Sequence, residues 1–177
     1  NCLKNDGMID QIIPIAYKTK EKREAYKRHF GFNFRESHCF RGYPYWGSIL
    51  PLEHTSAEYV AHLDSDMLIY ESPNFNWIEE SIRLMEENPE IVCVLPLSGP
   101  PDKKQVLHQG PNDYHYNHKM KAYLFKAFTS RVFVMHKERF MSLCPMKIKW
   151  LSWREPIYSI LLGKGKMLCW EATVSNA

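Results

Sequence analysis

The order of the hydrophobic segments constrains the fold of this chain most, because runs typical of strands alternate with runs typical of helices. Strands are indicated by apolar stretches at residues 8–17, 58–63, 90–97, 127–135 and 166–174. Helices are indicated by the residue pattern at 20–30, 77–88 and 155–162. Such alternation is typical of an α/β domain. We therefore expect a mostly parallel central sheet flanked by helices.

The size and composition of the chain fit one domain. Its 177 residues are 45% hydrophobic and 24% charged, which is ordinary for a globular protein that buries a core. No repeat, low-complexity tract or shift in composition marks a linker. We therefore expect a single domain over residues 1–177. The stretch at residues 100–121 lacks periodicity, and we expect an irregular loop there that closes over a ligand.

Charge and cysteine usage limit the partners and the compartment. The 23 basic and 20 acidic residues form no dense basic stripe, which argues against nucleic-acid binding. No apolar run reaches the length of about 18 residues that a membrane-spanning helix needs. The cysteines are odd in number and contain no CxxC pair, so neither a disulfide framework nor a zinc site is indicated. We therefore expect a reducing, cytoplasmic location.

Two aspartates, Asp64 and Asp66, follow the apolar run at residues 58–63 and are separated by Ser65. In extended backbone their side chains point the same way, and two carboxylates on one face suit Mn²⁺ or Mg²⁺. Such a metal bridges a bound diphosphate and stabilises the charge of the leaving group. All three residues also favour turns, so an ordinary turn is the alternative. The hydrophobic residues on both sides favour the metal site.

The segment around these aspartates resembles the GT-A glycosyltransferases, particularly the inverting enzymes of family 2. Residues 58–70 (EYVAHLDSDMLIY) resemble the signature in which an acidic pair binds metal and donor diphosphate. Residues 128–140 and 165–174 are similar to later strands of that family. The resemblance implies a GT-A (Rossmann-like) fold and a UDP- or GDP-sugar donor held at Asp64, Ser65 and Asp66. It also implies inverting transfer of a hexose to a carbohydrate or other hydroxyl acceptor in carbohydrate biosynthesis.

The chain departs from that family at its N-terminal end. The family's first strand, which helps to hold the nucleotide base, has no counterpart here. We therefore expect a domain that lacks this strand and is truncated at its N-terminus. The aspartate that often ends the second strand is also missing, because Ala16 and Tyr17 stand in its place.

Further site residues are predicted from the resemblance and from charge. Residues 153–156 (WREP) are similar to the family region that carries the catalytic base, which implies that Glu155 deprotonates the acceptor. A carboxylate can do this when burial raises its pKa, although Glu155 can also simply favour a helix N-terminus. Arg41 and Arg131 have planar guanidinium groups that can pair with phosphates. Asp102 and Asp113 are lesser candidates for the base.

Other functions fit parts of the same pattern. A nucleotidyltransferase shares this type of sheet and metal chemistry, but it usually has a glycine-rich basic loop early in the chain. A phosphatase with an aspartate nucleophile usually places its acids after the first strand. A catalytically inactive nucleotide-sugar-binding domain is the remaining alternative. His115 and His118 have the spacing of metal ligands on a helix, but no third ligand accompanies them.

Overall fold

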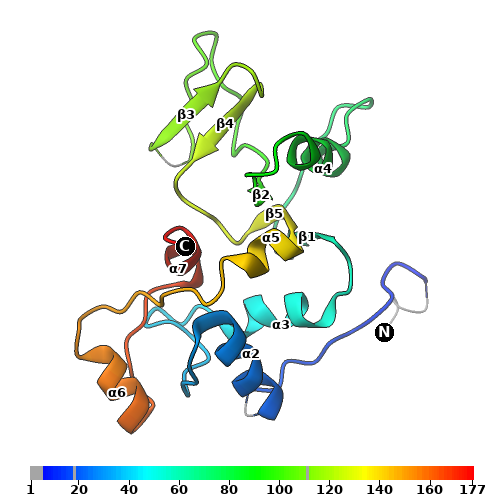
Figure 1. The fold of residues 1–177 in the computed structure, drawn as a ribbon. Helices are drawn as coiled ribbons and strands as arrows, with labels where there is room; N and C mark the ends of the chain where they lie inside the picture. Colours follow the sequence, from blue (N-terminus) through cyan, green and yellow to red (C-terminus); the bar gives the residue numbers. More distant parts are fainter. Residues whose placement is uncertain (1–5, 18, 111) are drawn as a thin grey trace.

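The computed structural model describes residues 6–17, 19–110 and 112–177, and its sheets are antiparallel (Figure 1). β5 (Val132–His136) lies between β1 (Tyr59–Leu63) and β2 (Cys93–Val94) and runs antiparallel to both. β3 (Tyr114–Asn117) and β4 (Ala122–Phe125) form a separate antiparallel pair. The predicted mostly parallel, Rossmann-like GT-A sheet is therefore wrong.

The parallel sheet was predicted from the alternation of strand-like and helix-like segments, and the burial of β5 shows why its apolar run did not correct that prediction. All five residues of β5 are buried. Phe133 and Met135 face the larger core, whereas Val132 and Val134 pack with Trp77 and other residues in a smaller one. A continuous apolar run is typical of parallel strands because helices cover both of their faces. Here the middle strand of a small antiparallel sheet is covered on both faces and has the same pattern.

The three predicted helices are confirmed as α2 (Lys20–Phe30), α4 (Trp77–Glu87) and α6 (Glu155–Leu162). Local signals define their ends. The side chains of Thr19 and Asn76 accept backbone N–H groups at the starts of α2 and α4. Gly31 and Gly163 follow α2 and α6 in the left-handed conformation, with φ of 77° and 64°.

Three further helices replace segments for which the sequence pattern indicated something else or nothing. They are α3 (Trp46–His54), α5 (Lys137–Ser142) and α7 (Trp170–Val174). The last of these lies within the predicted strand at residues 166–174. Across the parts of the chain that the structure describes, no helix is long and apolar enough to cross a bilayer.

The predicted strand at residues 8–17, all of which the structure describes, is also absent. This segment forms no ladder, and Met8, Ile12 and Ile15 are exposed by 70%, 48% and 45%. A strand needs a neighbour for its backbone groups, and no described strand pairs with this one. Hydrophobic composition alone therefore overestimated the strand content.

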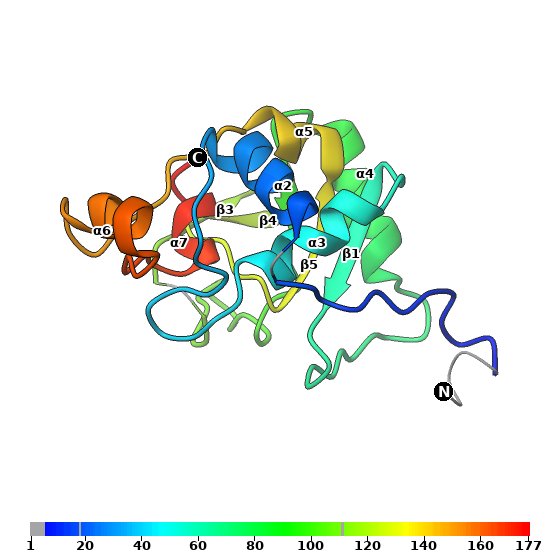
Figure 2. The same cartoon turned by 90° about the horizontal axis from the view of Figure 1, so that it is seen from below.

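The larger core joins elements from both ends of the chain. Figure 2 shows α2, α3 and α7 gathered around the sheet, and Trp46, Phe133 and Trp170 are all buried there. A buried hydrogen bond of 2.6 Å connects the hydroxyls of Tyr45 and Thr173, which links the start of α3 to α7. The position of the C-terminal helix is thereby tied to the centre of the molecule.

Candidate functional site

Asp64 follows β1 directly, and its position is set by the pairing of β1 with β5. Leu63 lies opposite Val132, and the Asp64 N–H donates to the Arg131 carbonyl at 2.8 Å, one step beyond the paired residues. The chain then turns, because the Met67 N–H donates to the Asp64 carbonyl at 3.0 Å. The expectation of an extended Asp64–Ser65–Asp66 segment is therefore wrong for the backbone.

The two carboxylates nevertheless converge on one cation, the guanidinium of Arg131. Nη2 of Arg131 donates to Oδ2 of Asp66 at 2.8 Å, and its Nε lies 3.6 Å from Oδ2 of Asp64. The hydrogen bond that Arg131 donates to Asp66 is the largest of the effects that raise the pKa of Arg131. The side chains of Arg131, Asp64 and Asp66 are exposed by 53%, 42% and 72%. This acid site, defined as Asp64, Asp66 and Arg131, is open to solvent.

His62 orients the first of the two aspartates. Its Nε2 lies 3.1 Å from Oδ1 of Asp64, and its ring stacks on Phe133 at 5.0 Å between centroids and 14° between planes. Asp64 therefore has a partner on each oxygen, whereas Asp66 forms an ion pair only with Arg131 among the described residues. Sequence reasoning missed His62, although its place two residues before Asp64 puts both side chains on one face of the strand.

The acid site fits a divalent ion that takes part of its coordination from a ligand. Within the described ranges, no group of three or more His, Cys, Asp or Glu side chains is placed to hold a metal ion. A complete protein cage is therefore ruled out for these residues. Mg²⁺ commonly uses one or two carboxylates and completes its shell with water and phosphate oxygens. Two carboxylates that already converge on one cation meet that smaller requirement.

Glu155 and Arg41 are not brought to the acid site. The Glu155 carboxylate accepts the Lys166 N–H at 2.8 Å, and Figure 2 shows α6 on the opposite side of the molecule from β1. Arg41 lies in an exposed turn, where its guanidinium carbon is 5.3 Å from the centre of the Phe40 ring. Ser65 is exposed at the corner of the acid-site turn.

A different carboxylate, that of Glu171, lies next to the segment that leads into β5. Ser130 precedes Arg131 and donates its hydroxyl to Oε1 of Glu171 at 2.7 Å. Glu171 lies in the first turn of α7. Sequence reasoning missed it because residues 166–174 were interpreted as a strand.

The stretch at residues 100–121 contains β3 and is more ordered than the predicted irregular loop. Asp102 accepts the backbone N–H groups of Lys104 and Val106 at 2.8 and 2.9 Å, and it therefore stabilises its own turn. Asp113 lies 3.5 Å from Lys126 in an exposed ion pair across the hairpin. Both carboxylates thus have local partners.

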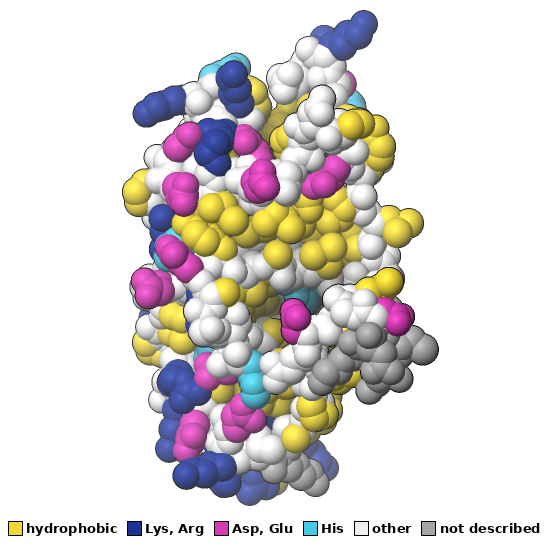
Figure 3. Space-filling view, turned by 90° about the vertical axis from the view of Figure 1, so that its right-hand side faces the viewer, with side chains coloured by type: hydrophobic (Ala, Val, Ile, Leu, Met, Phe, Trp, Pro, Cys, Tyr) yellow, Lys and Arg dark blue, Asp and Glu magenta, His cyan; other side chains and the backbone are white. Residues whose placement is uncertain are grey.

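An apolar pocket lies between α4, β2 and β4. It encloses about 770 Å³ and is lined by residues of α4, β2, β4 and the turn after Asp66, including Ile69 and Tyr70. Figure 3 shows hydrophobic side chains gathered in a broad band on one face of the molecule. Leu68 and Tyr70 are exposed by 99% and 91%. The segment that follows the aspartates therefore contributes to an apolar surface.

No protein-family model, curated protein or solved structure matches this chain. The chemistry that the site can perform therefore has to be inferred from its residues. Among the described residues, the acid site is where two carboxylates converge on one cation at the end of a strand.

Proposed function

We propose that the protein transfers a sugar from a UDP- or GDP-sugar donor to a carbohydrate or other hydroxyl acceptor, with inversion. Asp64 and Asp66 hold the divalent ion, Mn²⁺ or Mg²⁺, that binds the donor diphosphate. The convergence of both carboxylates on one cation at the end of β1 carries this proposal. The resemblance of residues 58–70 to the acidic-pair signature of family 2 enzymes supports it.

The side chains at and beside the acid site have different roles in binding the donor. Asp64 is held by His62 and supplies a fixed oxygen, whereas the more exposed Asp66 can adjust to the ligand. When bound, the metal neutralises charge on the diphosphate that leaves. The Arg131 fork can pair with a phosphate oxygen on the same side. Four neighbouring side chains thus bind and orient the donor.

The base that deprotonates the acceptor has two candidates. The family resemblance predicts Glu155 as the base, although its carboxylate lies in α6, away from β1. Glu171 is favoured by position, because its Ser130 partner adjoins Arg131. Turnover by Glu155→Gln and by Glu171→Gln distinguishes them once an acceptor is known, since only the base is essential for attack. Undiminished turnover of a variant excludes that residue.

A nucleotide-sugar-binding domain without turnover is the second candidate function. The position of Glu155 favours it, because the residue predicted to be the base is not brought to the acid site.

The four described cysteines are free of disulfides, which supports the cytoplasmic location proposed from the sequence.

Calorimetry with UDP and GDP, with and without Mn²⁺, tests the shared requirement of both candidates. We expect Mn²⁺-dependent nucleotide binding by the unchanged protein and its loss in Asp66→Asn. Asp113→Asn is the matched control, because it removes an exposed carboxylate that pairs with Lys126 on the hairpin. Nucleotide binding that neither Mn²⁺ nor Asp66→Asn affects contradicts the proposal.

A further inference from the structure

The backbone places Arg131 opposite Asp64 and leaves its side chain free to move. Arg131 immediately precedes β5, the buried central strand, and its carbonyl accepts the Asp64 N–H. The side chain is exposed by 53%, so the guanidinium can rotate into solvent without disturbing the core. The cation that contacts the aspartates is thus anchored at its backbone and exposed at its end.

A metal ion and the guanidinium need the same oxygens. Arg131 contacts Oδ2 of Asp64 and Oδ2 of Asp66. A divalent ion held by both carboxylates displaces the guanidinium from at least one of these contacts. Once displaced, the guanidinium lies beside a dication, and the two repel each other. A diphosphate relieves that repulsion, because its oxygens can bind the metal and accept hydrogen bonds from the arginine.

We propose that Arg131 is an internal counter-cation that occupies the acid pair until metal and diphosphate arrive together, and that then pairs with the diphosphate. This inference rests on the proposed function and adds a coupling between its two ligands. Arg131 opposes the binding of metal alone and supports the binding of nucleotide in the presence of metal. Arg131 is therefore a positioning residue whose removal has opposite effects on the two affinities.

Titration of Mn²⁺ followed by electron paramagnetic resonance tests the first effect in the absence of nucleotide. We expect Arg131→Gln to bind Mn²⁺ with a Kd roughly three- to tenfold lower than the unchanged protein, as for the loss of one exposed competing charge. Arg83→Gln is the matched control, because Arg83 also pairs with two carboxylates, those of Glu80 and Glu87 on α4. It is expected to leave the Mn²⁺ affinity unchanged.

Calorimetry with UDP at saturating Mn²⁺ tests the second effect. We expect Arg131→Gln to bind UDP about fivefold or more weakly, because the charge-assisted hydrogen bonds are lost. Arg131→Lys keeps the charge but lacks the planar fork, so its Mn²⁺ affinity should stay near that of the unchanged protein while its UDP affinity falls. Circular dichroism of each variant verifies the fold.

The outcomes separate this inference from the proposed function. Equal or weaker Mn²⁺ binding by Arg131→Gln overturns the counter-cation role and leaves the metal site intact. Unchanged UDP affinity in Arg131→Gln overturns the pairing with the diphosphate. If neither the unchanged protein nor Arg131→Gln binds Mn²⁺, the proposed function itself fails.

Discussion

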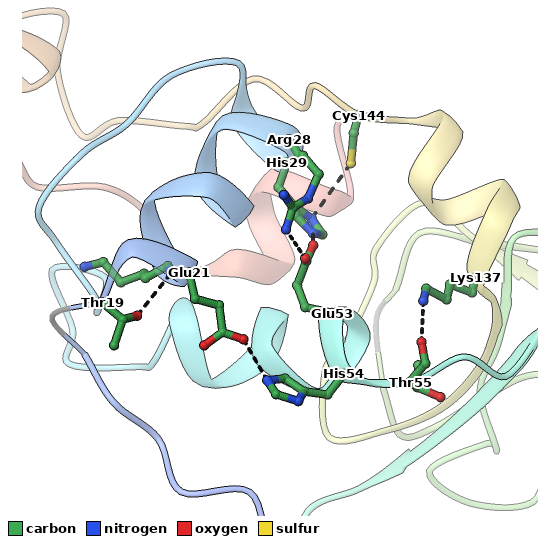
Figure 4. A network of polar contacts seen from close by, with 10 residues as sticks. Thr19, Glu21, Arg28, His29, Glu53, His54, Thr55, Lys137 and Cys144 are labelled. Carbon is green, nitrogen blue, oxygen red and sulfur yellow. Dashed lines mark hydrogen bonds and ion pairs between the residues drawn. The ribbon is translucent and has the colours of Figure 1, made fainter.

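Two of the regions in which an arginine pairs with carboxylate groups differ in the exposure of those carboxylates to water. In the first, Arg28 and His29 of α2 both contact Glu53 of α3 (Figure 4). The His29 side chain is fully buried and that of Glu53 is 13% exposed. In the second, the acid site, all three side chains are open to solvent. Similar residue types therefore serve different purposes at the two places.

The buried cluster joins three segments and is suited to stability. His29 Nε2 lies 2.8 Å from Glu53 Oε1, and its Nδ1 lies 3.8 Å from the Cys144 sulfur. The order Cys–His–Glu is that of a catalytic triad, but burial raises the pKa of the Cys144 thiol to about 11. An activated cysteine needs a lowered pKa. The cluster therefore holds α2 and α3 together, whereas we propose that the acid site exchanges one cation for another.

The largest effect expected from this comparison is on folding. Glu53→Ala leaves His29 and Arg28 without their partner, so we expect the free energy of unfolding to fall by about 3 kcal/mol. Asp66→Ala removes an exposed ion pair and should cost less than about 1 kcal/mol. Urea denaturation followed by circular dichroism measures both. Equal losses in the two variants would show that exposure does not separate the two regions.

The second-largest effect is expected at acid pH, which should weaken the buried cluster around Glu53. The hydrogen bond with His29, followed by that with Arg28, lowers the pKa of Glu53 from its ordinary 4.5 to about 2. Glu53 therefore stabilises the fold fully above pH 4.5. Between pH 4.5 and 2 the unfolded chain takes up the proton first, and stability falls by about 2 kcal/mol after allowance for solvent screening.

Urea denaturation across that pH range measures this loss. Glu53→Gln cannot ionise, so its stability should change less than that of the unchanged protein between pH 4.5 and 2. Parallel pH profiles for the two proteins would refute the assignment of this loss to Glu53.

The smallest effect is expected at Arg131. Arg131→Gln removes two exposed contacts, and the free energy of unfolding should change by less than about 1 kcal/mol. Salt sharpens the test, because about 1 M NaCl screens exposed charges and should remove even this difference. Thermal unfolding in low and high salt measures it. A salt-independent loss of several kcal/mol would place Arg131 with the buried cluster instead.

Local patterns predicted three of the six helices of the described residues and predicted the sheet poorly. α2 and α4 are defined by capping side chains and by apolar residues on one face, which lie within a few positions of one another. The pairing of a strand depends on residues far along the chain. β5 is hydrophobic enough for a parallel or an antiparallel position, and only the packing of the whole molecule selects between them.

The candidate site also combines features that follow from local sequence with features that depend on tertiary structure. The position of Asp64 and Asp66 at the end of a strand follows from the sequence, because an apolar run leads directly into them. Glu155 was chosen through a resemblance along the chain, and the structure places α6 away from β1. Glu171 contacts Ser130, the residue before Arg131, only because residues 170–174 form a helix against the core.

The sequence by itself determined the three helices, the strand before the acidic pair and the presence of two carboxylates one residue apart. Their causes are local, namely capping, periodicity and the turn preference of aspartate and serine. Only the tertiary structure decided that Arg131 and His62 contact these carboxylates. The antiparallel register of β1 and β5 brings Arg131 to Asp64, and Arg131 lies 65 positions from Asp66 along the chain. Such long-range pairing depends on how the two strands pack in the whole molecule.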